Sequence, residues 1–267
     1  MATTAEPLLS VRGVTVRFGG IVALDDVGFD VPRGLVCGLI GPNGAGKTTL
    51  FNCLSRLYHY QAGDILFVGR SITALPTDRM ASLGIGRTFQ NLAMFRTMSV
   101  RENVMVGAHV RSSAGFLACA LQLPRVGAEE RQLREHAATV MALLGLQAFA
   151  DQRVGNLPFA TQKRVEFGRA LAARPKLLLL DEPAAGLNHE ELAALADLIR
   201  TVRDRLGITV LLVEHHMSLV MGVSDRIVAL NFGRRIAEGA PADVRDDPAV
   251  IAAYLGAPAA RHHDLAA

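Results

Sequence analysis

The sequence predicts an α/β fold in which a mixed sheet with a parallel core is combined with an N-terminal antiparallel β subdomain and a helical subdomain. Short apolar runs of strand length alternate along the chain with stretches of helical character. Several of these runs end in polar residues, and ligands of parallel sheets lie beyond the carboxyl ends of the strands. The length of 267 residues suits one large domain with a subdomain.

The composition argues against several classes of protein. A formal net charge of +3 is spread over 28 basic and 25 acidic residues, so no duplex-binding face is expected. Aromatic residues are scarce and tryptophan is absent, which argues against a surface that stacks bases. We therefore expect no nucleic-acid partner. No apolar run approaches the roughly 18 residues that span a bilayer, and no signal-peptide pattern is present, so work at a membrane is expected to go through other proteins.

The cysteines predict a reducing compartment. Cys37, Cys53 and Cys119 are odd in number and lie in apolar surroundings. Such residues are more often buried thiols than disulfide partners, so we expect no disulfide.

Five apolar runs are predicted to form the main strands. Residues 8–18 and 27–31 are typical of edge or antiparallel strands. Residues 34–40, 177–183 and 208–215 are typical of buried strands, and each is followed by or ends in polar residues. We expect the chemistry to gather at one edge of the sheet.

The region between the first and second of these buried strands is predicted to contain a helical subdomain at about 91–160. Apolar residues recur there at helical spacing: Leu133, Val140, Met141 and Leu144. Residues 111–127 have no clear hydrophobic period, so the sequence is compatible with either a loop or a short helix there. We expect residues 8–256 to form the domain and residues 257–267, which are small and polar, to form a disordered tail.

The strongest motif is a glycine-rich loop between the buried strand at 34–40 and a helix predicted at 48–57. Its residues, with the next threonine, are Gly41, Pro42, Asn43, Gly44, Ala45, Gly46, Lys47, Thr48 and Thr49. The pattern is typical of a phosphate-binding loop, whose backbone N–H groups and helix N-terminus attract phosphate oxygens. We expect this segment to bind ATP, with Lys47 at the outer phosphates and the Thr48 hydroxyl on Mg²⁺. A glycine-rich turn without a ligand is the alternative, and the flanking strand and helix argue against it.

A carboxylate pair, Asp181 and Glu182, follows the apolar run at 177–180. A carboxylate at the end of such a strand can hold Mg²⁺ through water, and the next one can polarise the water that attacks the γ-phosphate. We expect Asp181 to take the metal role and Glu182 the catalytic role. An acidic turn without function is the alternative, and the phosphate-binding loop upstream makes it the weaker one.

The chain resembles the nucleotide-binding subunits of ATP-binding cassette (ABC) transporters in four segments that occur in the same order. These are GPNGAGKTT, the glutamine of RTFQN, LLLLDEPAAGLN and LLVEHHM. The resemblance covers nearly the whole chain and implies a P-loop NTPase cassette that hydrolyses ATP. It implies that Phe18 stacks on adenine, that His215 holds the γ-phosphate, and that Gln90 contacts the metal and the attacking water. The alternatives are that Phe18 is a core residue and that Gln90 and His215 are solvated polar residues.

The same resemblance bears on two neighbouring positions. Asn188 lies in a segment similar to the loop that crosses the dimer interface, where many relatives carry aspartate. His216 has no role that the resemblance implies, and we expect it on the surface.

One element departs from the family pattern. The family signature LSGGQ is replaced by Leu157, Pro158, Phe159, Ala160 and Thr161. In the family this segment contacts the ATP of the partner subunit through a serine hydroxyl, glycine N–H groups and a helix N-terminus. Pro158 offers neither a hydroxyl nor an N–H, and Ala160 adds a methyl group. We expect slow turnover, an intact helix N-terminus, and capping of that helix by Thr161.

Within the family, the chain resembles the branched-chain amino-acid import ATPases. The segments that carry this resemblance are RFGGIVAL, RTFQNLAMFRTMSVRENVMVGAH and a closing AAYLG. That resemblance implies a second cassette, identical or different, transmembrane permease subunits and an extracytoplasmic solute-binding protein. It also implies a peripheral position on the cytoplasmic face of the inner membrane of a bacterium. Importers of urea and short amides look similar, so the cargo is a weaker inference than the import role.

Three other functions are alternatives for a chain with this phosphate-binding loop. A soluble cassette ATPase of translation or DNA repair would usually carry two cassettes or a long coiled coil, and this chain has no sustained heptads. A regulatory subunit that binds ATP with little hydrolysis would explain the altered signature, but it has no evident need for Glu182. A kinase or GTPase would share only the phosphate-binding loop.

Overall fold

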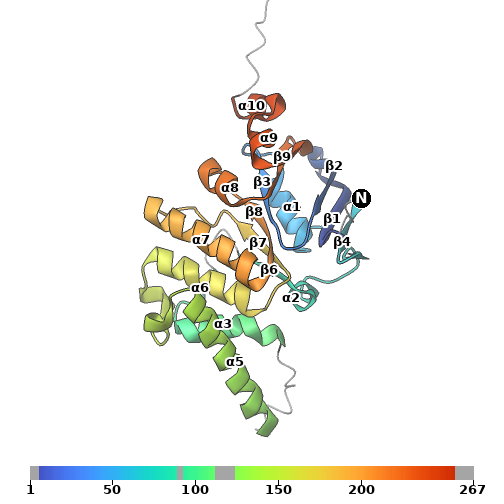
Figure 1. Cartoon of the computed structure of the whole chain (residues 1–267). Helices are drawn as coiled ribbons and strands as arrows, with labels where there is room; N and C mark the ends of the chain where they lie inside the picture. The colour runs from blue at the N-terminus through green and yellow to red at the C-terminus, as the bar shows by residue number, and fades with distance from the viewer. Residues whose placement is uncertain (1–5, 89–92, 112–123, 256–267) are drawn as a thin grey trace, which may run out of the picture.

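The computed structural model describes residues 6–88, 93–111 and 124–255. Within these residues there is a four-stranded sheet in the order β2-β1-β4-β5 and a six-stranded sheet in the order β10-β9-β3-β8-β7-β6. Figure 1 shows the four-stranded sheet on the side of α1, while α3, α5, α6 and α7 lie on the other side of the six-stranded sheet. The predicted α/β fold with two kinds of sheet and a helical layer is confirmed.

The strands of the described chain are β1 Leu9–Phe18, β2 Ile21–Val31, β3 Val36–Ile40, β4 Ala62–Phe67, β5 Arg70–Ser71, β6 Ile85–Arg87, β7 Leu177–Asp181, β8 Thr209–Val213, β9 Arg226–Asn231 and β10 Arg234–Gly239. The four-stranded sheet pairs β2, β1, β4 and β5 antiparallel. In the other sheet β9, β3, β8, β7 and β6 pair in parallel, and only β10 joins antiparallel. The predicted parallel core is therefore correct, and so are the five predicted strands.

The helices of the described chain are α1 Lys47–Leu54, α2 Arg79–Leu83, α3 Val100–Ala108, α5 Pro124–Leu143, α6 Phe159–Ala172, α7 His189–Leu206, α8 Met217–Val223, α9 Pro241–Arg245 and α10 Pro248–Leu255, with short 3₁₀ turns at η1 His109–Arg111, η2 Gln147–Phe149 and η3 Val154–Asn156. Helices α3, α5 and α6 pack on one another. None of the described helices is long and apolar enough to cross a membrane.

The six-stranded sheet separates two hydrophobic cores. Successive side chains of a strand point to opposite faces, so Leu178 and Leu180 of β7 pack with the helical layer while Leu177 and Leu179 pack with α1 and the four-stranded sheet. The central strands β3, β7 and β8 are buried along their whole length. A sheet covered on both faces explains why these strands are continuous apolar runs in the sequence.

The helical spacing predicted in α5 is confirmed. Val140, Met141 and Leu144 are buried in the core beneath it, and Leu133 is partly buried against the same core. The segment 111–127, for which the sequence did not distinguish a loop from a short helix, ends in a helix, because α5 begins at Pro124. The rest of that segment, residues 112–123, lies outside the described residues.

The prediction of buried thiols is confirmed for two of the three cysteines. Cys37 and Cys53 are buried free thiols, and burial raises the pKa of Cys37 to about 12 and that of Cys53 to about 11. Cys119 and the tail predicted at 257–267 lie outside the described residues.

Candidate functional site

The glycine-rich loop connects β3 to α1, as the sequence predicts. Gly41 has a φ of 151° and Gly46 a φ of 100°, a region that favours glycine. A Cβ atom at Gly41 would lie 2.2 Å from the Leu230 carbonyl oxygen of β9, and one at Gly46 would lie 2.7 Å from the Ala23 carbonyl oxygen of β2. Both glycines are therefore required by neighbouring backbone as well as by their own conformation.

The loop presents its outer residues to solvent. Asn43, Gly44 and Thr48 are exposed, and Thr49 is half-buried. Helix α1 begins without a side-chain cap at Gly46. Its first N–H groups thus add a partial positive charge to the exposed part of the loop.

Lys47 folds back onto the loop. Its Nζ donates hydrogen bonds to the carbonyl oxygen of Gly41 at 2.7 Å and to that of Pro42 at 3.0 Å. Burial lowers the pKa of Lys47, and the negative charge of Glu182 acts in the opposite direction. The predicted lysine and the predicted catalytic carboxylate therefore lie within electrostatic range of each other at the same edge of the sheet.

Asp181 ends β7 in a buried ion pair. Its Oδ2 accepts a hydrogen bond from the Arg87 guanidinium at 2.8 Å. The same guanidinium donates to Asn52 Oδ1 and to Ser55 Oγ, both on or directly after α1 and both at 2.9 Å. Arg87 thus ties the strand β6, the Asp181 carboxylate and the helix of the phosphate-binding loop together.

Sequence reasoning missed Arg87. The available signal was its position at the end of a short strand, as the first residue of the RTFQN motif. A buried guanidinium needs carboxylate and carbonyl partners, and no local pattern predicts that Asp181, 94 positions away, is one of them.

Glu182 follows β7 in a conformation that is unusual for a residue other than glycine, with a φ of 47°. Its N–H donates to the Val213 carbonyl oxygen at 2.9 Å, which ties the residue to the end of β8. Such positive φ values persist only where the surrounding structure holds them, and they cluster at functional sites.

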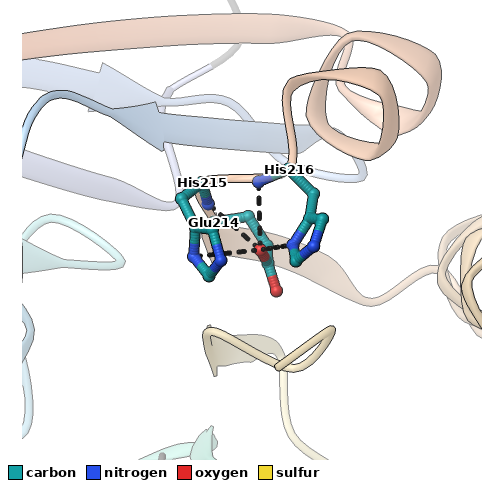
Figure 2. Close-up of side chains that lie close together, drawn as sticks. All are labelled: Glu214, His215 and His216. Atoms are coloured by element: carbon teal, nitrogen blue, oxygen red, sulfur yellow. Dashed lines mark hydrogen bonds and ion pairs between the residues drawn. The ribbon is translucent and has the colours of Figure 1, made fainter. Parts of the chain in front are cut away.

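Glu214 connects two loops at the sheet edge, and Figure 2 shows its carboxylate between His215 and His216. This fully buried carboxylate accepts the Ala184 N–H on Oε1 at 2.6 Å and the His215 N–H on Oε2 at 3.0 Å. The Nδ1 atom of His216 lies 3.2 Å from Oε2. Glu214 therefore fixes both the loop after β7 and the loop that carries His215.

Both histidines next to Glu214 keep part of their side chain exposed. The His215 side chain is 55% exposed and that of His216 38% exposed, and their rings lie 4.4 Å apart. His216 is at the surface as predicted, but its ring also contacts Glu214. With Glu214 they form a group whose ligand atoms could hold a metal ion. Because Oε2 already accepts backbone N–H groups, we interpret the group as a hydrogen-bonded support of the loop.

Sequence reasoning also missed Glu214. It stands directly after an apolar strand, as Asp181 stands at the end of one. That shared pattern was the signal that could have found it.

Phe18 stands at the end of β1, in the four-stranded sheet. It is 48% exposed and contacts the Tyr58 ring edge-on, with 5.4 Å between ring centres. The alternative that Phe18 is a core residue is therefore wrong. Gln90 lies outside the described residues.

The altered signature segment starts helix α6. Leu157 is buried and Phe159 is 48% exposed. The helix N-terminus is kept, as expected, but the helix begins at Phe159, ahead of Thr161. The predicted cap is wrong, because Pro158 is the N-cap residue and no side chain caps the helix. Thr161 is buried, and its Oγ1 accepts from Arg164 instead. As the third residue of the helix, Thr161 turns its side chain into the core and does not cap the helix.

Phe159 and Lys163 connect α6 to the loop after β7. An added Cβ at Gly186 would lie 3.0 Å from the Phe159 ring, so the ring packs against this glycine. Lys163 Nζ lies 5.4 Å from the centre of the same ring and donates to the Pro183 carbonyl oxygen at 2.9 Å. Lys163 is a further residue that sequence reasoning missed.

Asn188 begins helix α7 with a capping box. Its Oδ1 accepts the Glu191 N–H at 2.9 Å, and Glu191 Oε2 accepts the Asn188 N–H at 2.9 Å. The residue therefore has a structural role in addition to the interface role implied by resemblance.

Comparison with known proteins agrees with this geometry. The sequence profile "ABC transporter" matches residues 24–185, more than half of the chain. This chain belongs to the ABC transporter family. The cassette also matches the profile "Branched-chain amino acid ATP-binding cassette transporter" over residues 234–260.

Relatives of the cassette are known in several bacteria. It is 44% identical to the high-affinity branched-chain amino acid transport ATP-binding protein BraF of Pseudomonas aeruginosa, over 94% of this chain and 99% of that protein. It is 42% identical to LivG of Escherichia coli, of the same description, with the same coverage. The ABC ATP-binding proteins are ATPases that bind nucleotide, and the cassette shares their fold and is similar to them in sequence.

Solved structures support the same family. The ADP conformation of MJ1267, an ATP-binding cassette of an ABC transporter, has a TM-score of 0.82 at 30% identity, covering 94% of this chain and 100% of that one. The cbiO1 protein of Clostridium perfringens, part of the ABC transporter complex cbiONQ, has a TM-score of 0.78 at 28% identity, covering 92% of this chain and 94% of that one.

Proposed function

We propose that this cassette is the ATP-hydrolysing subunit of a bacterial importer of branched-chain amino acids or related small polar solutes. The observation that carries the proposal is the meeting of Lys47, Asp181 and Glu182 at the carboxyl edge of the parallel strands. The cargo is inferred from the descriptions of BraF and LivG.

The proposed roles follow from position and chemistry. The loop from Gly41 to Thr49 holds the phosphates of ATP, and Lys47 exchanges its bonds to loop carbonyls for bonds to phosphate oxygens. Glu182 polarises the attacking water, and His215 holds the γ-phosphate. Phe18, exposed beside Tyr58, offers a face for stacking on adenine.

The oxygen donors at this edge fit Mg²⁺. Mg²⁺ prefers oxygen ligands and usually keeps several of its waters. The Thr48 hydroxyl is exposed at the loop, and Asp181 already shares Oδ2 with Arg87, which suits a contact through water. We also assign Gln90 to this site, on the resemblance alone. Bound Mg²⁺ would neutralise charge on the phosphates.

We further propose that residues 8–256 form one nucleotide-binding domain with a helical subdomain at about 91–160. In a dimer of cassettes, the segment from Leu157 to Thr161 meets the ATP of the partner, and Asn188 lies in the loop at the interface. Permease subunits, a second cassette and an extracytoplasmic solute-binding protein complete the transporter, which places the cassette on the cytoplasmic face of the membrane.

A regulatory subunit with little hydrolysis is not favoured. Pro158 and Ala160 weaken the contacts across the interface, but Lys47, Glu182 and His215 are all retained. The N-terminus of α6 is also retained without a side-chain cap, so its N–H groups can still interact with phosphate.

The test is ATP hydrolysis and leucine uptake by the cassette reconstituted with its membrane subunits and binding protein. The native chain should couple the two, and Glu182→Gln should lower hydrolysis by about 10²- to 10⁴-fold. The matched control is Glu135→Gln on the exposed surface of α5. If the native chain binds ATP but hydrolyses it no faster than Glu182→Gln, the regulatory function replaces this one.

A further inference from the structure

The C-terminal helix α10 reaches the phosphate-binding loop. The Tyr254 phenolic oxygen accepts a hydrogen bond from the Gly41 N–H at 2.8 Å, between residues 213 positions apart. Figure 1 shows α10 at the end of the six-stranded sheet, next to α9 and beyond β9. Tyr254 also lies within residues 234–260, the segment matched by the branched-chain profile.

The contact falls on the first residue of the loop. Gly41 is buried, and the Leu230 carbonyl oxygen leaves no space for a Cβ atom there. A buried backbone N–H needs an acceptor, and leaving it without one costs free energy. Tyr254 supplies that acceptor from a distant part of the chain.

Gly41 is held on both of its polar groups. Its N–H donates to Tyr254, and its carbonyl oxygen accepts from Lys47 Nζ at 2.7 Å. Tyr254 and the phosphate-binding lysine therefore hold the same residue, one from each side. A displacement of Gly41 would move the carbonyl that positions Lys47.

We propose that Tyr254 is a positioning residue for the phosphate-binding loop, which makes nucleotide affinity depend on the C-terminal helix. The inference rests on the proposed function, because it assigns Tyr254 to the same nucleotide site. The tyrosine does not touch the reacting atoms; it acts through Gly41 and Lys47. Burial raises the pKa of the Tyr254 phenol, although the Gly41 N–H lowers it, so the group stays neutral near pH 7.

The test compares three variants of the full-length chain by equilibrium binding of ADP. Tyr254→Phe removes only the oxygen, and a hydrogen bond of ordinary strength predicts an affinity about 2- to 10-fold weaker. Tyr60→Phe is the matched control, because it also removes a hydrogen-bonded phenolic oxygen, at Thr73 in another part of the chain. Lys47→Ala reports whether ADP occupies the phosphate-binding loop at all.

Two further measurements separate positioning from general stability. Hydrogen exchange of the Gly41 amide should become faster in Tyr254→Phe and stay unchanged in Tyr60→Phe. In the reconstituted transporter, Tyr254→Phe should raise the KM for ATP more than it lowers kcat. Both tyrosine variants should unfold at similar temperatures.

The outcomes distinguish the two proposals. If Lys47→Ala binds ADP as tightly as the native chain, the proposed nucleotide site is wrong. If Lys47→Ala weakens binding but Tyr254→Phe does not, or if Gly41 exchange is unchanged, the role of Tyr254 is wrong while the proposed function stands. A lower unfolding temperature with unchanged ADP affinity also overturns it, since that result means a purely structural contact.

Discussion

The phosphate-binding loop and the altered signature segment both lead into a helix that begins without a side-chain cap, α1 at Gly46 and α6 at Pro158. Helices α3 and α7, in contrast, begin with complete capping boxes. An uncapped N-terminus leaves its first N–H groups for a ligand. The helix N-terminus of the signature is therefore kept even though its serine and glycines are replaced.

The two regions differ in what holds them in place. Glycines with positive φ, a buried lysine and a buried ion pair hold the phosphate side. The signature side is held by the Phe159 ring on Gly186 and by Lys163 on the Pro183 carbonyl oxygen. Changes on the phosphate side should therefore have large effects, whereas the signature side should tolerate, or even gain from, substitution.

The largest effect is expected from Arg87→Met. Removing the guanidinium leaves the Asp181 carboxylate buried without its cation, which should lower the free energy of unfolding by about 3–5 kcal/mol. Urea denaturation measures this. The control is Arg134→Met, which breaks an exposed pair with Glu130 and should cost about 0.5 kcal/mol or less. Equal losses would show that the phosphate side does not depend on buried charge.

The next effect is expected from Lys47→Ala. Loss of the ammonium that would contact phosphate should weaken ATP binding by about 100-fold, close to 3 kcal/mol. Lys176→Ala, an exposed lysine just before β7, should leave binding unchanged. Isothermal titration with ATP measures both. A loss of ATP affinity below 3-fold in Lys47→Ala would contradict the expectation that the phosphate side is more sensitive to substitution than the signature segment.

A gain is expected from restoring the signature. The combined change of Pro158→Ser, Phe159→Gly, Ala160→Gly and Thr161→Gln returns a hydroxyl and close backbone N–H groups, and steady-state hydrolysis by the assembled transporter should rise by about 10-fold. Phe159→Gly alone removes the packing on Gly186 without adding a donor, so it should not speed hydrolysis. A native rate equal to that of the restored signature contradicts the prediction of slow turnover.

The smallest effect is expected at a helix cap. Asn188→Ala should lower the free energy of unfolding by about 1 kcal/mol, and Ser99→Ala, the matched cap of α3, should do the same. If Asn188 also acts at the dimer interface, only Asn188→Ala should slow hydrolysis in the transporter. Unchanged hydrolysis in both variants would limit Asn188 to capping.

The sequence predicted the fold and much of the sheet edge because these features are local. Strand, loop and helix are consecutive around Lys47, and Asp181 and Glu182 end a continuous apolar run. Long-range partners could not be predicted in this way. The pairing of Arg87 with Asp181 depends on β6 lying beside β7, and the pairing of Tyr254 with Gly41 depends on the whole sheet being assembled.

The cap of α6 could not be predicted for a different reason. Threonine is a good N-cap residue, but a cap must precede the first helical turn. The helix starts at Phe159, which turns Thr161 inward. A difference of three positions in the N-cap, Pro158 instead of Thr161, decided that prediction.

The position of β3 has a consequence for the order of folding during synthesis. Both of its neighbours, β8 and β9, lie downstream, and about 170 residues separate the end of β3 from the end of β8. A ribosome that adds about 5–20 residues per second needs about 9–35 s to produce them. Strands β1, β2 and β4 can pair with one another early in synthesis. Strand β3, the apolar strand that leads into the phosphate-binding loop, stays unpaired until β8 and β9 are made. During that time it is an exposed apolar segment of the kind that chaperones bind.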